Sequence, residues 1–218
     1  MSISTPEPGR GRGRGRGRPA RSGDDPAVRE LILRAARSVF ARSGYHDATL
    51  QRIAQEAGVT RPAISHHFSS KAALYSAVFE EVRQRVVVTG IHRAVDASTH
   101  LQDRLATFLM SSVEVDAEDR SYAAFITASL LDTARSPELH HLTRRHLDDL
   151  RAFLKRVCED AVTAEELPAS TDIATSAEAL LAIVWGTGLY GAYLGDHQQL
   201  TAVSERVVAM VRGLLTID

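Results

Sequence analysis

The stretch RIAQEAGVTRPAISHHFSSKAALY, residues 52–75, decides the fold. Apolar residues recur in it at helical spacing on both sides of the short turn Gly58-Val59-Thr60. Gly58 favours the end of one helix. Thr60 is a good N-terminal cap for the next, and Pro62 falls in its first turn, where a missing N–H costs nothing. Two short helices joined by a tight turn with glycine predict a helix-turn-helix.

The two short helices are expected to share one small core with the helix before them. The residues spaced to form that core are Ile53, Ala54, Val59, Ile64 and Phe68. Such a core would hold the second helix, residues 61–67, as a rigid rod whose outward face offers Arg61, Pro62, Ser65 and His66. A rod of this kind fits the major groove of DNA, where its first residues meet base edges.

The rest of the chain shows helical patterns as well. Asp25 and Pro26 predict the start of a first helix that ends at Gly44, Thr49 caps a second helix through Ala57, and Ser69 or Ser70 caps a longer one through about Ala94. Further helices are expected at about 101–117, 121–134, 137–162, 170–195 and 198–215. No stretch alternates with period two for long, so the predicted fold class is all-α.

Charge is distributed unevenly along the chain. Residues 1–71 carry 13 Lys+Arg against 6 Asp+Glu, a net +7, and residues 72–218 carry 13 against 21, a net −8, which together give the −1 of the whole chain. A basic segment joined to an acidic one indicates a nucleic-acid-binding part attached to a part with another role.

Neither a membrane span nor secretion is expected. Cys158 is the single cysteine, so no intrachain disulfide can form, a reducing cytoplasm fits, and the thiol is expected in the core. The arginines near the N-terminus are not followed by an apolar segment, as they would be in a signal peptide. The longest uncharged apolar run, Ala179–Leu194, falls short of the roughly 20 residues of a membrane helix and predicts a buried helix.

Residues 40–75, FARSGYHDATLQRIAQEAGVTRPAISHHFSSKAALY, resemble the DNA-binding region of the TetR family of bacterial repressors. The resemblance covers about residues 26–80 and is carried by Phe40, Gly44-Tyr45, Thr49, Ile53-Ala54, Ala57-Gly58-Val59-Thr60, Ile64, His67-Phe68, Lys71 and Leu74. It implies a three-helix DNA-binding domain at residues 26–72 and a larger helical domain for effector binding and dimerisation at residues 73–218.

The resemblance also implies roles for single residues. Thr49, His67 and Lys71 match positions that contact phosphates, and Gln51, Arg61, Pro62 and His66 match positions that can face bases. Ser65 stands where the family usually has a tyrosine, so this position keeps a hydroxyl but loses reach. Physically, the Arg61 guanidinium can bind a guanine through two hydrogen bonds, and Lys71 places a charge beside helix N–H groups that suit a phosphate.

Residues 1–25 form an arm of alternating arginine and glycine with almost no apolar side chains, which is expected to be disordered. The segment Arg16–Pro19, RGRP, resembles the core of an AT-hook, so Arg16 and Arg18 are candidates for contacts in the minor groove. A solvated tail without a specific partner is the alternative.

The acidic helical half contains no motif of an enzyme: no glycine-rich phosphate loop, no His-Glu-x-x-His and no Gly-x-Ser-x-Gly. No catalytic residue, cofactor or metal site is therefore expected. His66 and His67 are neighbours on a helix and point too far apart to chelate one ion. His140, His141 and His146 are expected on a solvated helix face.

Two sets of residues in this half are candidates for function. The aromatic and thioether side chains that can line an effector pocket are Phe108, Met110, Tyr122, Phe125, Trp185 and Tyr190. The stripe of small residues Gly188, Gly191 and Gly195, together with Val207 and Val211, can form a four-helix bundle across a two-fold axis. Ordinary core packing within one chain is the alternative for both sets.

The sequence therefore predicts a cytoplasmic homodimer that represses transcription, binds a palindromic operator, and is released by a small-molecule effector. The alternative is an architectural DNA-binding protein that needs no ligand and uses the arginine-glycine arm. The operator, the regulated genes and the effector stay open at this stage, as does a role in activation.

Overall fold

The computed structural model describes residues 26–194 and 196–215 of the 218-residue chain. Its elements are α1 (Pro26–Asp47), α2 (Leu50–Ala57), α3 (Arg61–His67), α4 (Lys71–Val82), η1 (Arg83–Val88), α5 (Thr89–Ala97), α6 (Leu101–Glu118), α7 (Ser121–Arg135), η2 (Pro137–Leu139), α8 (His140–Thr163), α9 (Ile173–Leu194) and α10 (His197–Leu215). Within the described ranges there is no strand, so the predicted all-α class is confirmed. The arm with Arg16 and Arg18, and Gly195, lie outside the described residues.

The helix-turn-helix forms as its caps predict. The Thr49 hydroxyl accepts a hydrogen bond from the backbone N–H of Arg52 at 3.2 Å, and the Thr60 hydroxyl accepts one from Ala63 at 3.3 Å. Gly58 ends α2 in the left-handed conformation, with φ 65°. Since each of these residues supplies what a helix end needs, the angle between α2 and α3 is fixed locally.

A second glycine shapes the end of α1. Gly44 has φ 69° and ψ 174°, so the helix is interrupted there although helical turns resume up to Asp47. A Cβ atom at this position would lie 3.0 Å from Oδ1 of Asp132 in α7. Glycine is therefore required twice at this position, once by the positive φ and once by the close approach of α7.

The helix expected from Ser70 to about Ala94 is a nearly continuous rod made of three elements. Ser70 caps α4 through a hydrogen bond from Ala73, and the rod continues through η1 and α5 to Ala97. The element η1 is a π-helix, which the apolar periodicity did not predict. Such segments are rare, occur mostly as single turns inside α-helices, and are frequent at functional sites.

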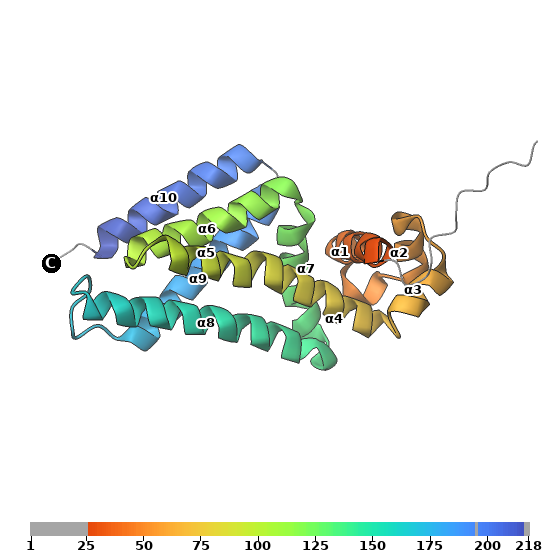
Figure 1. Ribbon diagram of the computed structural model, residues 1–218, viewed down its shortest axis with the longest axis horizontal. Coiled ribbons are helices and arrows are strands. Elements are labelled where there is room, and N and C mark those ends of the chain that lie inside the picture. The colour runs from red at the N-terminus through yellow and green to blue at the C-terminus, as the bar shows by residue number, and fades with distance from the viewer. Residues whose placement is uncertain (1–25, 195, 216–218) are drawn as a thin grey trace, which may run out of the picture.

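The molecule has two bodies along its long axis, a small one with α1–α3 and a larger bundle that ends near the C-terminus (Figure 1). One hydrophobic core joins α1–α4 to Tyr122 and Phe125 of α7 and to Leu139. A second core lies within the larger bundle and includes Phe108, Leu154 and the buried Cys158, whose thiol pKa is raised by burial. Helix α7 lies where the two bodies meet and packs along α1.

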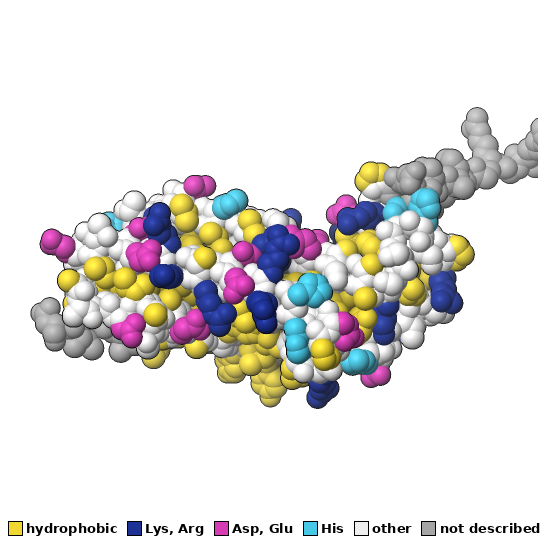
Figure 2. All heavy atoms as spheres, turned by 90° about the horizontal axis from the view of Figure 1, so that it is seen from below, with side chains coloured by type: hydrophobic (Ala, Val, Ile, Leu, Met, Phe, Trp, Pro, Cys, Tyr) yellow, Lys and Arg dark blue, Asp and Glu magenta, His cyan; other side chains and the backbone are white. Residues whose placement is uncertain are grey.

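Helix α9 differs from its prediction. The segment Ile173–Tyr193 spans 21 residues with a mean hydropathy of 1.3, enough by length and composition to cross a membrane, and only 22% of its most apolar window is buried in the chain. The helix is longer than the uncharged run Ala179–Leu194, and the expectation that it is buried in the core is wrong. Exposed apolar side chains on its outer side include Leu189 and Tyr193, which are 51% and 85% exposed. Figure 2 shows hydrophobic side chains gathered at the lower edge of the larger body.

Candidate DNA-binding surface and effector pocket

Helix α3 presents most of the residues that the sequence assigned to DNA. Arg61, Pro62, Ser65 and His66 are exposed on α3, and Thr49 and Gln51 are exposed at the start of α2. These elements lie at the opposite end of the molecule from the last turns of α10 (Figure 1). The fully buried Ile53 and Ile64 anchor the other side of the helix pair. The surface is thus rigid and accessible, and the base and phosphate contacts of its residues stay predictions.

Lys71 has a different role from the one expected. Its ammonium group donates hydrogen bonds to the carbonyl oxygens of Tyr45, His46 and Ala48 at 2.7, 3.1 and 3.1 Å. It also lies 4.6 Å from the centre of the Tyr45 ring. Because an ammonium has three N–H bonds, these carbonyls occupy all of them. Lys71 therefore closes the end of α1 and does not offer a free charge to a phosphate.

His67 is also less available than expected. Its side chain is half-buried, and its Nε2 atom is buried without a hydrogen-bond partner among the described residues. The ring lies 6.3 Å from that of Phe68, which is in the small core. A phosphate contact by His67 would need the ring to be reached from the exposed side of α3, so its proposed role is weaker than that of Arg61 or Thr49.

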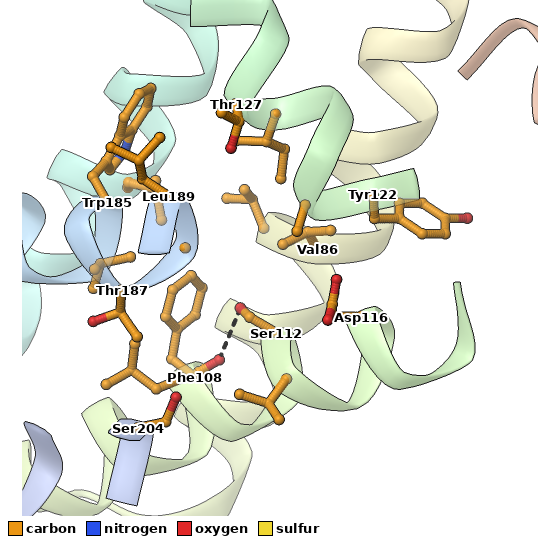
Figure 3. Close-up of a pocket in the computed structure, with 18 of the residues that line it drawn as sticks. Val86, Phe108, Ser112, Asp116, Tyr122, Thr127, Trp185, Thr187, Leu189 and Ser204 are labelled. Carbon is orange, nitrogen blue, oxygen red and sulfur yellow. Dashed lines mark hydrogen bonds between the residues drawn. The ribbon is translucent and has the colours of Figure 1, made fainter. Parts of the chain in front are cut away.

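A cavity of about 90 Å³ lies inside the larger bundle (Figure 3). Its walls come from η1, α6, α7, α8, α9 and α10, and most of its lining is apolar. Of the predicted pocket residues, Phe108, Tyr122 and Trp185 line it. The volume corresponds to about six to nine water-sized groups, enough for a small organic molecule.

Three other predicted pocket residues lie elsewhere. Phe125 is buried in the core that α7 shares with the small body, and its ring centre lies 6.5 Å from that of Phe40 and 6.0 Å from that of Phe79. Tyr190 is 46% exposed and stacks on Tyr193 at the surface. Met110 lines a shallow surface depression. Aromatic or thioether character alone does not decide between a pocket, a core and a surface.

The polar groups of the cavity were missed by the sequence analysis. Asp116, His146 and Ser204 line it and are buried, and each has side-chain atoms without a hydrogen-bond partner within the described part of the chain. The sequence did indicate that Asp116 is buried, because it lies seven residues after Leu109 and so continues the apolar stripe of Leu105 and Leu109. Groups of this kind are the ones a polar ligand would satisfy.

His146 corrects an expectation about the histidines of α8. Its ring is buried between Phe79 and Trp185, with ring centres 5.8 and 6.0 Å away, instead of lying on a solvated face. Burial lowers the pKa of His146 to about 4, opposed by Asp149. The imidazole is therefore neutral at pH 7. His140 and His141 are exposed, as expected.

Tyr122 belongs both to the cavity and to an ion-pair network at the DNA-binding body. Arg37 of α1 binds Glu81 and Asp119, each at 2.6 Å, and its guanidinium carbon lies 3.7 Å from the centre of the Tyr122 ring. The Tyr122 hydroxyl donates a hydrogen bond to Glu81, and burial, followed by this carboxylate, raises the pKa of Tyr122 to about 12. A ligand that moves the ring would disturb the partners of α1 directly.

The other side of α7 holds the DNA-binding body as well. Oδ2 of Asp132 accepts hydrogen bonds from the backbone N–H of Tyr45 at 2.9 Å and from the hydroxyl of Tyr75 at 3.1 Å. These partners come from the end of α1 and from α4. Ile126 and Thr127 of the same helix line the cavity. Helix α7 thus forms a wall of the cavity and also holds the small body with α1–α3.

The predicted dimer residues pack mostly within one chain. A Cβ atom on Gly191 would lie 2.7 Å from Cδ1 of Leu200, so this glycine lets α9 and α10 approach closely. Val207 and Val211 pack in the second core, and Gly188 lines the cavity. The exposed side of the two helices instead carries Leu189, Tyr190, Tyr193 and Met210. In the described residues, no group of three or more His, Cys, Asp or Glu is placed to hold a metal.

Comparison with known proteins assigns both parts of the chain. Residues 32–78 match the family described as bacterial regulatory proteins, tetR family, and residues 101–216 match the C-terminal domain of BetI-type transcriptional repressors. The HTH-type transcriptional regulator UidR of Escherichia coli (strain K12) is 23% identical over 189 residues, 87% of this chain and 93% of UidR. The regulator SrpR of Pseudomonas putida is 27% identical over 176 residues, 78% of each chain.

Solved structures share the fold. The transcriptional regulator FadR from Bacillus subtilis, solved in complex with stearoyl-CoA, superposes with a TM-score of 0.71 at 20% identity, covering 83% of this chain and 96% of FadR. The ketosteroid transcriptional regulator KstR2 of Mycobacterium tuberculosis has the same TM-score at 18% identity, covering 90% and 98%. At these identities the likeness extends to the arrangement of the helices.

Proposed function

Since the chain belongs to the TetR family of bacterial transcriptional regulators, we propose that it is a ligand-responsive repressor that acts as a cytoplasmic homodimer on a palindromic operator. One observation carries the ligand-responsive part. Helix α7 walls the cavity through Tyr122 and Ile126 and holds the DNA-binding body through Asp132 and the Arg37 network. A molecule bound in the cavity therefore contacts the helix that packs against α1, and α1 shares its core with Ile64 of α3.

In the proposed complex, two copies of α3 enter successive major grooves about 34–36 Å apart. Arg61 reads a base, and Gln51, Pro62, Ser65 and His66 lie close enough on the same pair of helices to add base contacts. Thr49 and His67 contact phosphates. Arg16 and Arg18 of the arm add contacts in the minor groove that are nearly independent of sequence.

The second copy of the chain would bind the exposed side of α9 and α10. Leu189, Tyr193 and Met210 leave apolar surface in water, and Gly186 of α9 has no atom within 4 Å of where its Cβ would be. Bulky apolar side chains next to a position without a side chain suit the close, self-complementary contact of a two-fold axis. The proposed interface thus uses the predicted helices and keeps the exposed Gly188, whereas Gly191, Val207 and Val211 pack within the chain.

The effector would act by changing the distance between the two copies of α3 in the dimer. Only a ligand with different affinities for the operator-bound and the released arrangement can do this, and DNA and effector must then weaken each other by the same factor. The route proposed here runs from the Tyr122 ring to Arg37 and Glu81, and from α7 through Asp132 to the end of α1. The π-helix η1, whose Val86 and Val87 line the cavity, offers a second adjustable contact.

An architectural DNA-binding role without a ligand remains the second candidate, because it rests on the net charge of +7 in residues 1–71. Selection of binding sites from a pool of random duplexes by the purified full chain separates the two. The repressor role predicts an inverted repeat whose half-sites are about 10 bp apart from centre to centre. Enrichment of A·T-rich DNA without a repeat would support the architectural role instead.

A further inference from the structure

We propose that the effector is an amphiphilic cation, a compact apolar molecule with one protonated amine that binds the Asp116 carboxylate. This inference rests on the proposed function, because it takes the cavity to be the effector site. It goes further by assigning the charge of the ligand and the residue that recognises it.

Asp116 is placed as a receptor for a cation. It is only 3% exposed, and neither carboxylate oxygen has a hydrogen-bond partner in the described chain. The nearest cationic group is Nε of Arg120, at 4.0 Å, the outer limit of an ion pair. Figure 3 shows the carboxylate directed from α6 into the space below Val86 and Tyr122. A buried carboxylate without hydrogen bonds is costly, so a ligand that donates N–H bonds to it gains that free energy on binding.

The remaining lining does not suit an anion. Neither lysine nor arginine occurs among the described residues that line the cavity, and His146 is neutral at pH 7 because burial lowers its pKa. Asp116 is therefore the one formal charge on these walls, as far as the described residues go. Burial raises the pKa of its carboxyl, with Arg120 and then His197 opposing that effect. An incoming ammonium group would stabilise the ionised form, whereas a carboxylate or phosphate would be repelled by it.

Two more unpaired groups define the rest of the ligand. Ser204 is fully buried with an unpaired hydroxyl oxygen, and Nδ1 of His146 is unpaired as well. In Figure 3, Ser204 lies across the cavity from Asp116, with Phe108 between them. The best ligand therefore has an ammonium at one end, an apolar middle, and a hydroxyl or amide that reaches Ser204 or His146.

The test uses three probes that differ in their head group alone: octylamine, octan-1-ol and octanoate. Each has eight carbon atoms, and each is kept below the concentration at which it forms micelles. Trp185 is the only tryptophan of the chain and lines the cavity, so its fluorescence reports binding to the full-length protein directly. At pH 7 octylamine should bind at least about tenfold more tightly than octan-1-ol, and octanoate should bind most weakly.

Asp116→Asn should remove the preference for octylamine and leave the affinity for octan-1-ol within about threefold. Glu114→Gln is the matched control, since it removes a carboxylate from the exposed side of the same helix, where Glu114 pairs with Arg93. It should keep the full preference. Thermal unfolding of each variant checks that it is folded, and the comparison of the three probes on the unaltered chain needs no variant.

The proposal is overturned if octan-1-ol or octanoate binds as tightly as octylamine, if no probe binds, or if Asp116→Asn leaves the preference intact. The proposed function is tested separately by adding each probe to the operator complex. If octan-1-ol wins and releases DNA, the repressor role stands and the cationic effector is wrong. If octylamine binds through Asp116 with no effect on DNA affinity, the cation site stands and ligand-responsive repression is wrong.

Discussion

At the scale of single residues, Arg61 is the residue that we expect to read the operator sequence. It is exposed at the first position of α3, held there by the Thr60 cap. We expect Arg61→Ala to cost about 1–3 kcal/mol of binding to the operator and much less on random DNA. Anisotropy titrations on both duplexes measure this. Arg156→Ala, which removes an exposed arginine from α8, should leave the ratio unchanged, and equal losses on both duplexes for Arg61→Ala would contradict the assignment.

Lys71 is expected to act on stability. Lys71→Met keeps the aliphatic stem and removes three charge-assisted hydrogen bonds to the carbonyls of Tyr45, His46 and Ala48. Unfolding by denaturant should show a decrease of about 1–3 kcal/mol in the free energy of unfolding. The chain's other lysine provides the control, because Lys155 is exposed and pairs loosely with Glu159 at 3.9 Å. A stable Lys71→Met variant that binds DNA more weakly would return this residue to the phosphate-binding role first expected.

His146 makes stability depend on pH in a defined window. Burial lowers its pKa from 6.5 to about 4, so between these values the unfolded chain binds a proton that the folded chain does not. The stability is complete above about pH 6.5 and is lost as the pH falls to 4, by at most on the order of 3 kcal/mol. His146→Phe should flatten the unfolding free energy in this window. His141→Phe, at an exposed site, should not, and an unchanged slope in His146→Phe would refute the assignment.

The residues whose roles could be predicted from the sequence interact with positions nearby in the chain. The others interact with residues far away in the chain. Thr49, Gly58, Thr60 and Ser70 act on atoms within a few positions, so the pattern contains their whole explanation. Lys71, His146 and Asp116 depend on partners brought together from distant helices. His146 lies four residues before Leu150 and seven before Phe153, so it falls on the buried stripe of α8, but its partners Phe79 and Trp185 come from other helices and could not be read from that pattern.

At the scale of elements, the helices were predictable and their outward faces less so. The caps and glycines set the bounds of α1–α3 and the start of α4 closely, whereas the end of α4 at Val82 and the π-helix η1 were not predicted. In α9 the apolar residues surround the helix, so periodicity did not separate the side of Gly191, which packs on Leu200, from the side of Tyr193. A stripe of glycines does not by itself identify a dimer interface, because small residues serve close packing within a chain equally well.

The exposed side of α9 is expected to hold the dimer together. Tyr193→Glu places a charge at an apolar residue that is 85% exposed in one chain, so the charge costs the monomer little and would cost a buried interface much. Analytical ultracentrifugation should show that this variant dissociates at least about tenfold more readily. Val95→Glu alters an exposed valine on α5 and should leave the dimer intact. Equal behaviour of the two variants would place the interface elsewhere.

At the scale of the whole molecule, charge divides the chain into a basic N-terminal third and an acidic remainder, which suits a DNA-binding part joined to a regulatory part. The arm is expected to add affinity with little choice of sequence. Removing residues 1–24, which include six arginines, should make the fall of affinity with salt less steep. In a plot of the logarithm of affinity against the logarithm of salt concentration, the slope should become shallower by about one for each phosphate that the arm neutralises. The preference for operator over random DNA should change little. An unchanged slope would show that the arm stays away from DNA.

A footprint of the full chain on the DNA flanking its own gene, at near-physiological salt, is the direct test of the proposed repressor role. We expect a short protected palindrome whose two halves lie about one helical turn apart, and weaker protection by the Arg61→Ala and Tyr193→Glu variants at the same protein concentration. Diffuse protection without symmetry, fading as salt rises and unaffected by Arg61→Ala, would contradict it.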